Sequence, residues 1–177
     1  MKDIVVFRLS HRLPRDERVT THVALVARAF GAKKMYYTGE RDKEMEESVK
    51  KVVEKWGGNF EVEHTDTSKL KELKREGYSL IHLTMYGQRI ETISLPSDKV
   101  VLIVGGEKVP RWIYEFSDLN ASITNQPHSE IAALAITLHF IYKGRELSTE
   151  FEDREFKGRI KIVPSEKSKV IRKRENT

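Results

Sequence analysis

Short apolar runs alternate with segments of helical periodicity along most of the chain. The runs are rich in residues that favour strands, and they cover residues 4–7, 35–38, 60–64, 80–84, 100–104 and 121–124. The run 100–104 is continuously apolar, which is typical of a central strand in a parallel sheet. The pattern therefore predicts six strands.

Five helices are predicted between and after these runs. Val19, Val23, Val26 and Phe30 fall on one helical face, and Gly31 follows as a stop signal. Similar apolar faces, with proline or Thr/Ser at the start or glycine at the end, predict helices over residues 45–56, 67–77, 110–116 and 127–142. The alternation indicates an α/β fold with a mostly parallel sheet and helices on both faces.

The last of these segments, 127–142, is apolar nearly all round. A helix of this kind is normally buried on several sides. Two explanations are open at this point. Either the helix lies inside the domain, or a second subunit covers it.

The pattern changes after Gly144. Residues 148–151 and 158–163 are expected to pair as a short antiparallel hairpin, and the segment from Ser165 is basic and is expected to be mobile. We therefore expect a main domain over 1–145, a hairpin extension over 146–164 and a basic flexible tail over 165–177.

Composition limits the class of protein. The 177 residues are 33% charged with a net charge of +5, which favours a polyanionic partner only weakly, because a solvated charged surface explains it equally well. Cysteine is absent, so disulfides and thiolate metal sites are excluded. The apolar runs are too short for a signal peptide or a membrane span, and a cytoplasmic protein is expected. Abundant Lys, Arg and Glu are typical of heat adaptation.

Three polar segments follow predicted strands, where open α/β sheets bind their ligands. The first, 11–18, carries Arg12, Arg15 and Arg18, which could hold phosphates or assist an oxygen nucleophile; a solvated loop with a helix cap at Asp16 is equally consistent. The second, 104–110, contains paired glycines that permit close backbone approach, although Gly-Gly alone is more often a plain turn.

The third segment, 123–130, leads into the apolar helix, and free backbone N–H groups at that helix start could bind a ligand. Ordinary capping explains the same residues. Familiar alternatives are absent: the chain has no GxGxxG after its first strand, no P-loop, no GxSxG elbow and no zinc-type histidine spacing. His82 and His139 lie in apolar surroundings and are expected to be packed core residues.

Together these segments resemble the three motifs of the SPOUT superfamily of knotted RNA methyltransferases. The fit is closest to the archaeal tRNA cytidine 2′-O-methyltransferases, and it covers most of residues 1–145, with the matching stretches at 8–32, 104–110 and 125–135. The resemblance implies a C-terminal trefoil knot, S-adenosylmethionine as cofactor, a homodimer, no metal, and a T-loop cytidine of tRNA as the target.

The resemblance also implies which residues line the cofactor pocket. They come from the fourth strand and the second and third segments: Leu83, Gly105, Gly106, Glu107, Lys108, Val109, Ile123, Thr124, Asn125, Gln126, Pro127, His128, Ser129 and Glu130. Crowding or strain is expected from a side chain at Gly106. Methylation of another RNA nucleotide and non-catalytic RNA binding are the alternative functions.

One departure from the family pattern concerns the catalytic arginine. Ribose methyltransferases of this superfamily carry an asparagine and an arginine in the first motif, and this chain has Val19 and Leu25 at those places. The candidates are therefore Arg18, Arg15 and Arg12, in that order. An arginine stays protonated, so it would act by stabilising negative charge on the 2′-oxygen rather than as a base.

Overall fold

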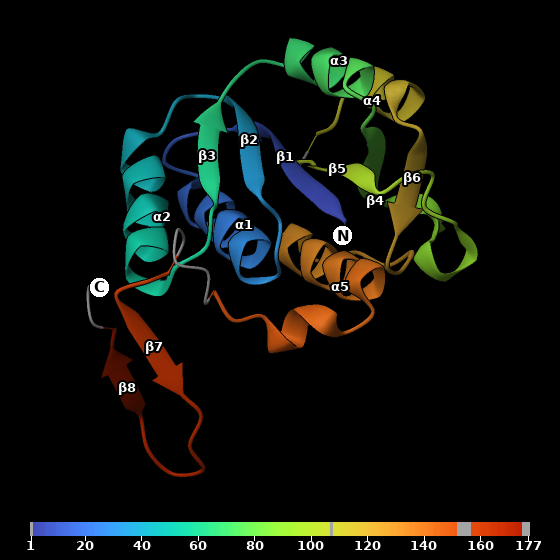
Figure 1. Cartoon of the computed structure of the whole chain (residues 1–177). Coiled ribbons are helices and arrows are strands. Elements are labelled where there is room, and N and C mark those ends of the chain that lie inside the picture. The colour runs from blue at the N-terminus through green and yellow to red at the C-terminus, as the bar shows by residue number, and fades with distance from the viewer. Residues whose placement is uncertain (1, 107, 152–156, 175–177) are drawn as a thin grey trace.

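The centre of the structure, a computed structural model that describes residues 2–106, 108–151 and 157–174, is a six-stranded sheet. The strand order is β3-β2-β1-β5-β4-β6, and every neighbouring pair is parallel. The strands are β1 (Asp3–His11), β2 (Lys34–Gly39), β3 (Glu61–His64), β4 (Ser79–Arg89), β5 (Lys99–Val104) and β6 (Leu119–Ser122). All six predicted strands are thus confirmed (Figure 1).

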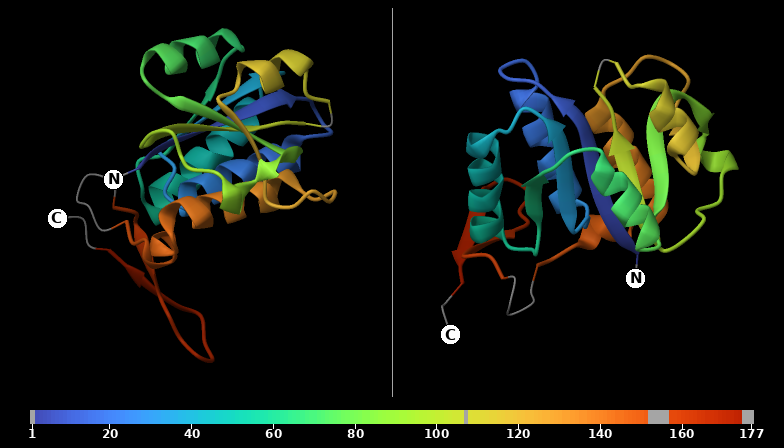
Figure 2. Two further views of the ribbon diagram at one scale, coloured as in Figure 1. Left: turned by 90° about the vertical axis from the view of Figure 1, so that its right-hand side faces the viewer. Right: turned by 90° about the horizontal axis from the view of Figure 1, so that it is seen from above.

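Helices cover both faces of the sheet (Figure 2). One face carries α1 (Glu17–Ala29), α2 (Lys43–Trp56) and α5 (Glu130–Tyr142), and the other carries α3 (Ser68–Arg75) and α4 (Arg111–Phe116). Alternate residues of β1 explain this layering, because Ile4 and Val6 point into the first core and Val5 and Phe7 into the second. Among the described residues, no helix is long and apolar enough to cross a membrane.

Two strands run further than their apolar runs indicated. β1 continues through Arg8 to His11, and β4 continues to Arg89 with a register irregularity, since Leu83 and Gln88 both lie opposite Ala121. Polar residues fit inside these strands because tertiary neighbours satisfy them. Short 3₁₀ turns, η1 (Ile90–Thr92) and η2 (Arg145–Ser148), follow β4 and α5.

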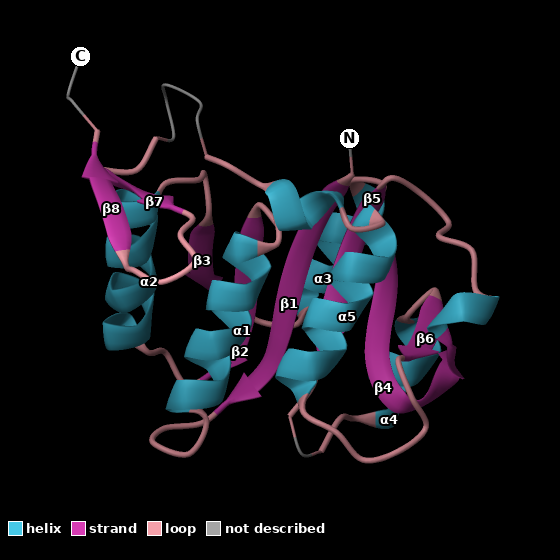
Figure 3. Ribbon diagram, turned by 90° about the horizontal axis from the view of Figure 1, so that it is seen from below, coloured by secondary structure: helices cyan, strands magenta, loops and turns pink. Residues whose placement is uncertain are grey.

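The apolar helix α5 begins at Glu130 rather than at Pro127. Its start is set by Ser129, whose hydroxyl accepts a hydrogen bond from the Ile131 amide at 3.1 Å. The inner side packs on α1, as Figure 3 shows, and buries Leu134 and Leu138 fully. The domain itself therefore covers one side of the helix.

The C-terminal hairpin forms from other segments than the sequence indicated. β7 (Ile160–Val163) lies within the predicted strand 158–163, but it pairs antiparallel with β8 (Val170–Lys173), which is in the segment expected to be a mobile tail. Pairing with 148–151 is wrong in the part that the structure describes, because Ser148 ends η2 and 149–151 form no strand. The hairpin projects from the body beside α2 (Figure 1).

Candidate active site at the strand ends

A cavity of about 280 Å³ opens at the carboxyl ends of β4 and β5. It lies where parallel α/β sheets bind ligands. Of the predicted pocket residues, six line it together: Leu83, Gly105, Gly106, Val109, His128 and Glu130. A larger hollow of about 730 Å³ lies between α2 and β3, but its lining is mostly charged and it holds none of the three motif segments.

Other predicted pocket residues do not line this cavity. Glu107 lies outside the described residues. The remaining ones are not among the residues that line it: Lys108, Ile123, Thr124, Asn125, Gln126, Pro127 and Ser129. Asn125 is the clearest case, since its side-chain amide donates to the carbonyls of Met85 at 2.7 Å and Gly87 at 3.1 Å and so fixes the third segment beside β4.

The loop after β5 leaves little room for a side chain at position 105. A Cβ atom on Gly105 would lie 2.3 Å from a methyl group of Val109, so the Val109 side chain or the loop must shift if one is added. A Cβ atom on Gly106 would lie 3.8 Å from its nearest neighbours, which is ordinary contact. Strain at Gly106 is therefore not expected from the protein itself, and any crowding there must come from a ligand.

Arg8 belongs to the site although it lies outside the three polar segments. Its side chain is buried in β1, where Nη1 donates to the Gly105 carbonyl and lies 3.9 Å from the Glu130 carboxylate. Burial lowers the pKa of Arg8, although Glu130 and Asp16 raise it. A lone arginine inside the apolar run Val5–Leu9 was the signal in the sequence, because such a charge is buried only with partners.

The first segment lies at the end of β1. His11 is not in the loop but is the buried last residue of the strand, bonded to Thr20 at 2.7 Å and Asp42 at 3.1 Å. Asp16 precedes α1 without capping it, since its carboxylate accepts from the Arg12 amide at 3.0 Å and from Arg15. These contacts stabilise the loop from within.

The three candidate arginines differ in their partners. Arg12, Arg15 and Arg18 are all exposed, and none lines the cavity. Arg15 forms an ion pair with Asp16 at 3.0 Å. Arg18 lies in the first turn of α1 and makes no hydrogen bond or ion pair to another described residue. Its guanidinium is therefore available to a ligand.

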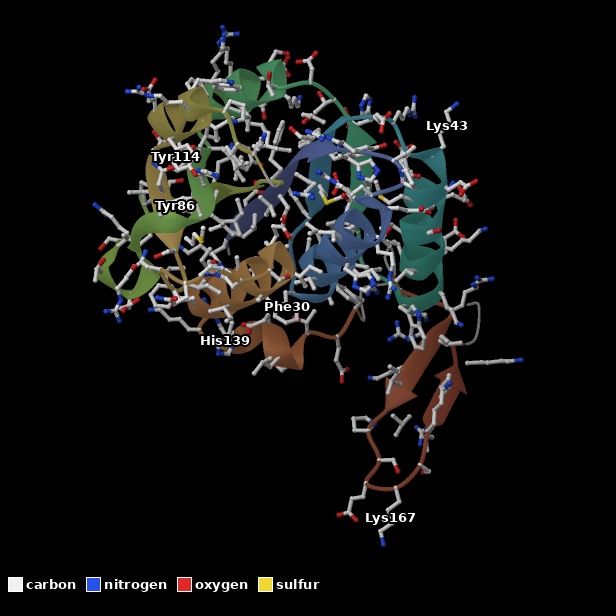
Figure 4. The ribbon with its side chains drawn as sticks, turned by 180° about the vertical axis from the view of Figure 1, so that it is seen from behind. Phe30, Lys43, Tyr86, Tyr114, His139 and Lys167 are labelled. Carbon is white, nitrogen blue, oxygen red and sulfur yellow. The ribbon has the colours of Figure 1, made fainter. Side chains whose placement is uncertain are left out.

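The two histidines that were expected in the core differ. His82 is buried as expected, but it also lines the cavity, and its Nδ1 lies 2.9 Å from Asn120 Oδ1. The expectation is wrong for His139, because about half of its side chain is exposed on α5 and it bonds to the buried Glu146. Figure 4 shows Tyr86 and Tyr114, which also line the cavity, at one end of the molecule, with His139 away from them.

Comparison with known proteins agrees with this architecture. Residues 56–172 match the model of the family described as tRNA ribose 2′-O-methyltransferase, aTrm56. Among its relatives, the tRNA (cytidine(56)-2′-O)-methyltransferase of Methanosphaera stadtmanae is 51% identical over 97% of this chain and 99% of its own length. The protein of the same name from Methanocaldococcus jannaschii is 50% identical over 98% of both chains.

Solved structures show the same fold. The TrmH/SpoU tRNA modifying enzyme of A. aeolicus superposes with a TM-score of 0.61 at 20% identity, over 83% of this chain and 77% of that one. AviRb of Streptomyces viridochromogenes, in complex with AdoMet, superposes with a TM-score of 0.60 at 15% identity, over 85% of this chain and 60% of that one. Within the described residues, no cluster of His, Asp or Glu could hold a metal ion. Because the family model matches residues 56–172 and two relatives are 50–51% identical along nearly the whole chain, the chain belongs to the aTrm56 family of tRNA ribose 2′-O-methyltransferases.

Proposed function

We propose that this protein transfers a methyl group from S-adenosylmethionine to the ribose 2′-hydroxyl of cytidine 56 in tRNA. The observation that carries the proposal is identity of 50–51% to enzymes of that name along nearly the whole chain. Because the substrate is tRNA, we infer that the enzyme works in the cytoplasm. The cavity at the strand ends supplies a place for the reaction.

The residues around the cavity fit the cofactor. Leu83 and Val109 offer apolar surface, and the backbone at Gly105 and Gly106 has no side chains that keep a ligand away. Glu130, about one-third exposed, places a carboxylate at the wall of the cavity, where it suits the positive groups of the cofactor. S-adenosylmethionine, when bound, supplies an electrophilic methyl group on a sulfonium. The protein's part is to hold the ribose oxygen in line with it at roughly 3 Å.

Arg18 is our candidate for the catalytic arginine. A ribose hydroxyl becomes a good nucleophile as it loses its proton, and a guanidinium that lies beside it stabilises the negative charge that develops on oxygen. Arg15 is already paired with Asp16, whereas Arg18 is exposed and unpaired among the described residues at the start of α1. Arg15 and Arg12 remain the second and third candidates.

Single-turnover kinetics at saturating tRNA tests this role. Arg18→Ala should lower the methylation rate by about 100- to 1000-fold and leave the affinity for S-adenosylhomocysteine unchanged. Arg75→Ala, which removes an exposed arginine at the end of α3, serves as the matched control. A near-normal rate for Arg18→Ala would transfer the role to Arg15 or Arg12, and a loss only in tRNA affinity would indicate phosphate binding.

The target nucleotide is tested directly on tRNA. A transcript with 2′-deoxycytidine at position 56 lacks the acceptor oxygen, and it should take up no labelled methyl group from S-adenosylmethionine. The unmodified transcript should carry the label at position 56 and nowhere else. Equal labelling of both transcripts would show that another nucleotide is the target.

We also propose that the protein is a homodimer with α5 in the interface. The outer side of α5 leaves Ile136 and Phe140 about 49% and 41% exposed, and Leu147, in the turn η2 that contacts α5, is 73% exposed. A stripe of large apolar side chains of this kind is what a self-complementary interface covers. Sedimentation velocity should give a dimer for the wild type and a monomer for Ile136→Glu. A monomeric wild type at micromolar concentration would refute the proposal.

Two further features complete the proposal. We propose a C-terminal trefoil knot in which the third segment lies against β4, where the Asn125 side-chain amide donates to the carbonyls of Met85 and Gly87. The hairpin β7–β8 presents exposed cations that suit tRNA phosphates, and Figure 4 places Lys167 at its tip. The others are Lys169, Arg172 and Lys173.

A further inference from the structure

His82 has a defined tautomer because of its neighbours. The side-chain amide of Asn120 donates through Nδ2 to the Tyr114 carbonyl at 2.9 Å, so its Oδ1 atom faces the imidazole as an acceptor. Nδ1 of His82 must therefore carry the ring proton and donate it over 2.9 Å. The edge of the same ring meets the ring of Tyr114, at a centroid distance of 4.6 Å, which fixes its orientation further.

The other ring nitrogen, Nε2, is consequently an acceptor. It is buried and has no hydrogen-bond partner among the described residues. An unpaired buried acceptor costs free energy that a suitable donor recovers. Most buried polar atoms are paired, so this exception at the wall of the cavity points to a ligand that brings the missing donor.

The position of Nε2 relates it to the cofactor loop. A Cβ atom on Gly105 would lie 4.0 Å from Nε2 and 2.3 Å from a Val109 methyl group, so both side chains lie on the same side of Gly105. Val109 therefore packs where a ligand would approach the histidine. We expect its isopropyl group to turn aside when the cavity is filled.

We propose that Nε2 of His82 accepts a hydrogen bond from the exocyclic amino group of the cofactor's adenine. The proposal rests on the proposed function, because it needs S-adenosylmethionine in this cavity. It makes His82 a positioning residue that selects a 6-amino purine over a 6-oxo purine. A 6-oxo group would set a second acceptor against the Nε2 lone pair.

The surroundings favour the purine end of the cofactor at His82 over the amino-acid end. Leu83, Val104 and Val109 line this part of the cavity with apolar groups that suit a flat ring. Glu130 is the carboxylate among the described lining residues, and it suits the positive groups of the methionine moiety instead. Burial lowers the pKa of His82, although the Asn120 bond raises it, so the ring is neutral at pH 7 and keeps its acceptor.

A ligand-coupled cycle tests the proposal. Calorimetric titration of the full-length protein with S-adenosylhomocysteine and with S-inosylhomocysteine, its 6-oxo counterpart, gives the purine preference. We expect the wild type to prefer adenine by about tenfold or more, which is what one mismatched buried acceptor provides. In His82→Phe, which keeps a planar ring without the acceptor, the preference should fall at least about fivefold. The matched control His22→Phe, at an exposed position on α1, should keep the wild-type preference.

Other outcomes count against the assignment. Equal loss of affinity for both purines in His82→Phe would overturn it and indicate a packing role, and unchanged affinities would indicate that a water molecule satisfies Nε2. A wild type that binds neither purine would overturn the proposed function and the His82 assignment with it.

A measurement on the wild type keeps the proposal testable if His82→Phe does not fold. The ¹⁵N resonance of the unprotonated His82 ring nitrogen should move on addition of S-adenosylhomocysteine and much less on addition of S-inosylhomocysteine, because only the first carries a donor at position 6 of the purine, where the 6-oxo purine carries an acceptor. An equal shift with both ligands, or with neither, would overturn the hydrogen bond.

Discussion

Replacing Arg8 by methionine should weaken cofactor binding by more than it weakens the fold. The guanidinium is 1% exposed and connects β1 to both sides of the cavity, through the Gly105 carbonyl and the Glu130 carboxylate. Methionine fills much of the same volume without the charge. The change therefore removes the connection and leaves the packing of β1 largely in place.

The size of the effect follows from the contacts. A hydrogen bond from a charged donor contributes about 1.5–3 kcal/mol, and about 1.4 kcal/mol corresponds to a tenfold change in affinity. If Arg8 holds the Gly105 loop in its binding conformation, the affinity for S-adenosylhomocysteine should fall about 10- to 100-fold. The free energy of unfolding should fall by only about 1–2 kcal/mol, because removal of a buried cation also removes its desolvation cost, which the lowered pKa of Arg8 reflects.

Calorimetric titration with S-adenosylhomocysteine, with chemical denaturation alongside, measures both quantities. Arg28→Met is the matched control, because Arg28 is another buried arginine whose guanidinium donates to a glycine carbonyl, that of Gly57 at 2.6 Å. Gly57, unlike Gly105, does not line the cavity. Arg28→Met should lose stability and keep wild-type affinity. Wild-type affinity in a folded Arg8→Met protein would refute the role of Arg8 in holding the loop.

Three further changes probe the loop and the frame around it. Gly105→Val should lower the calorimetric affinity for S-adenosylhomocysteine at least about tenfold in a folded protein, because its Cβ would lie 2.3 Å from a Val109 methyl group and the added side chain would crowd the cavity. Wild-type affinity would contradict this. Gly87→Ala should lower the free energy of unfolding, measured in urea, by about 1–3 kcal/mol, because the new Cβ would lie 2.6 Å from the backbone of β6. An unchanged midpoint of unfolding would show that β4 and β6 move apart at little cost. Asp16→Asn should destabilise the protein at pH 7 and progressively less as the pH falls below 3.8, a trend that denaturation at several pH values checks. Burial raises the pKa of Asp16, but hydrogen bonds from Arg15 and the Arg12 amide hold it below 3.8, so its stabilisation is present above that pH and is lost as the carboxylate protonates.

The amino-acid sequence by itself determined the elements and the location of the motif loops. Burial on one or both faces leaves a periodic trace, so the run 100–104 marked a central strand and the face of Val19 and Val23 marked α1. Periodicity does not report where a side-chain hydrogen bond begins an element, so the predicted start of α5 was wrong. α5 begins at Glu130 because the Ser129 hydroxyl caps it, whereas proline at position 127 only permits a helix start.

Only the tertiary structure decided which segments meet. Arg8 and Gly105 are 97 positions apart, and they touch because β1 and β5 are neighbours in the sheet. Periodicity reports which face of an element is buried but carries no information on its partner, so the same limit explains why β8 rather than 148–151 pairs with β7. Only the tertiary structure could show the tautomer of His82 as well, because Asn120 and Tyr114 determine it and leave Nε2 unpaired at the cavity wall.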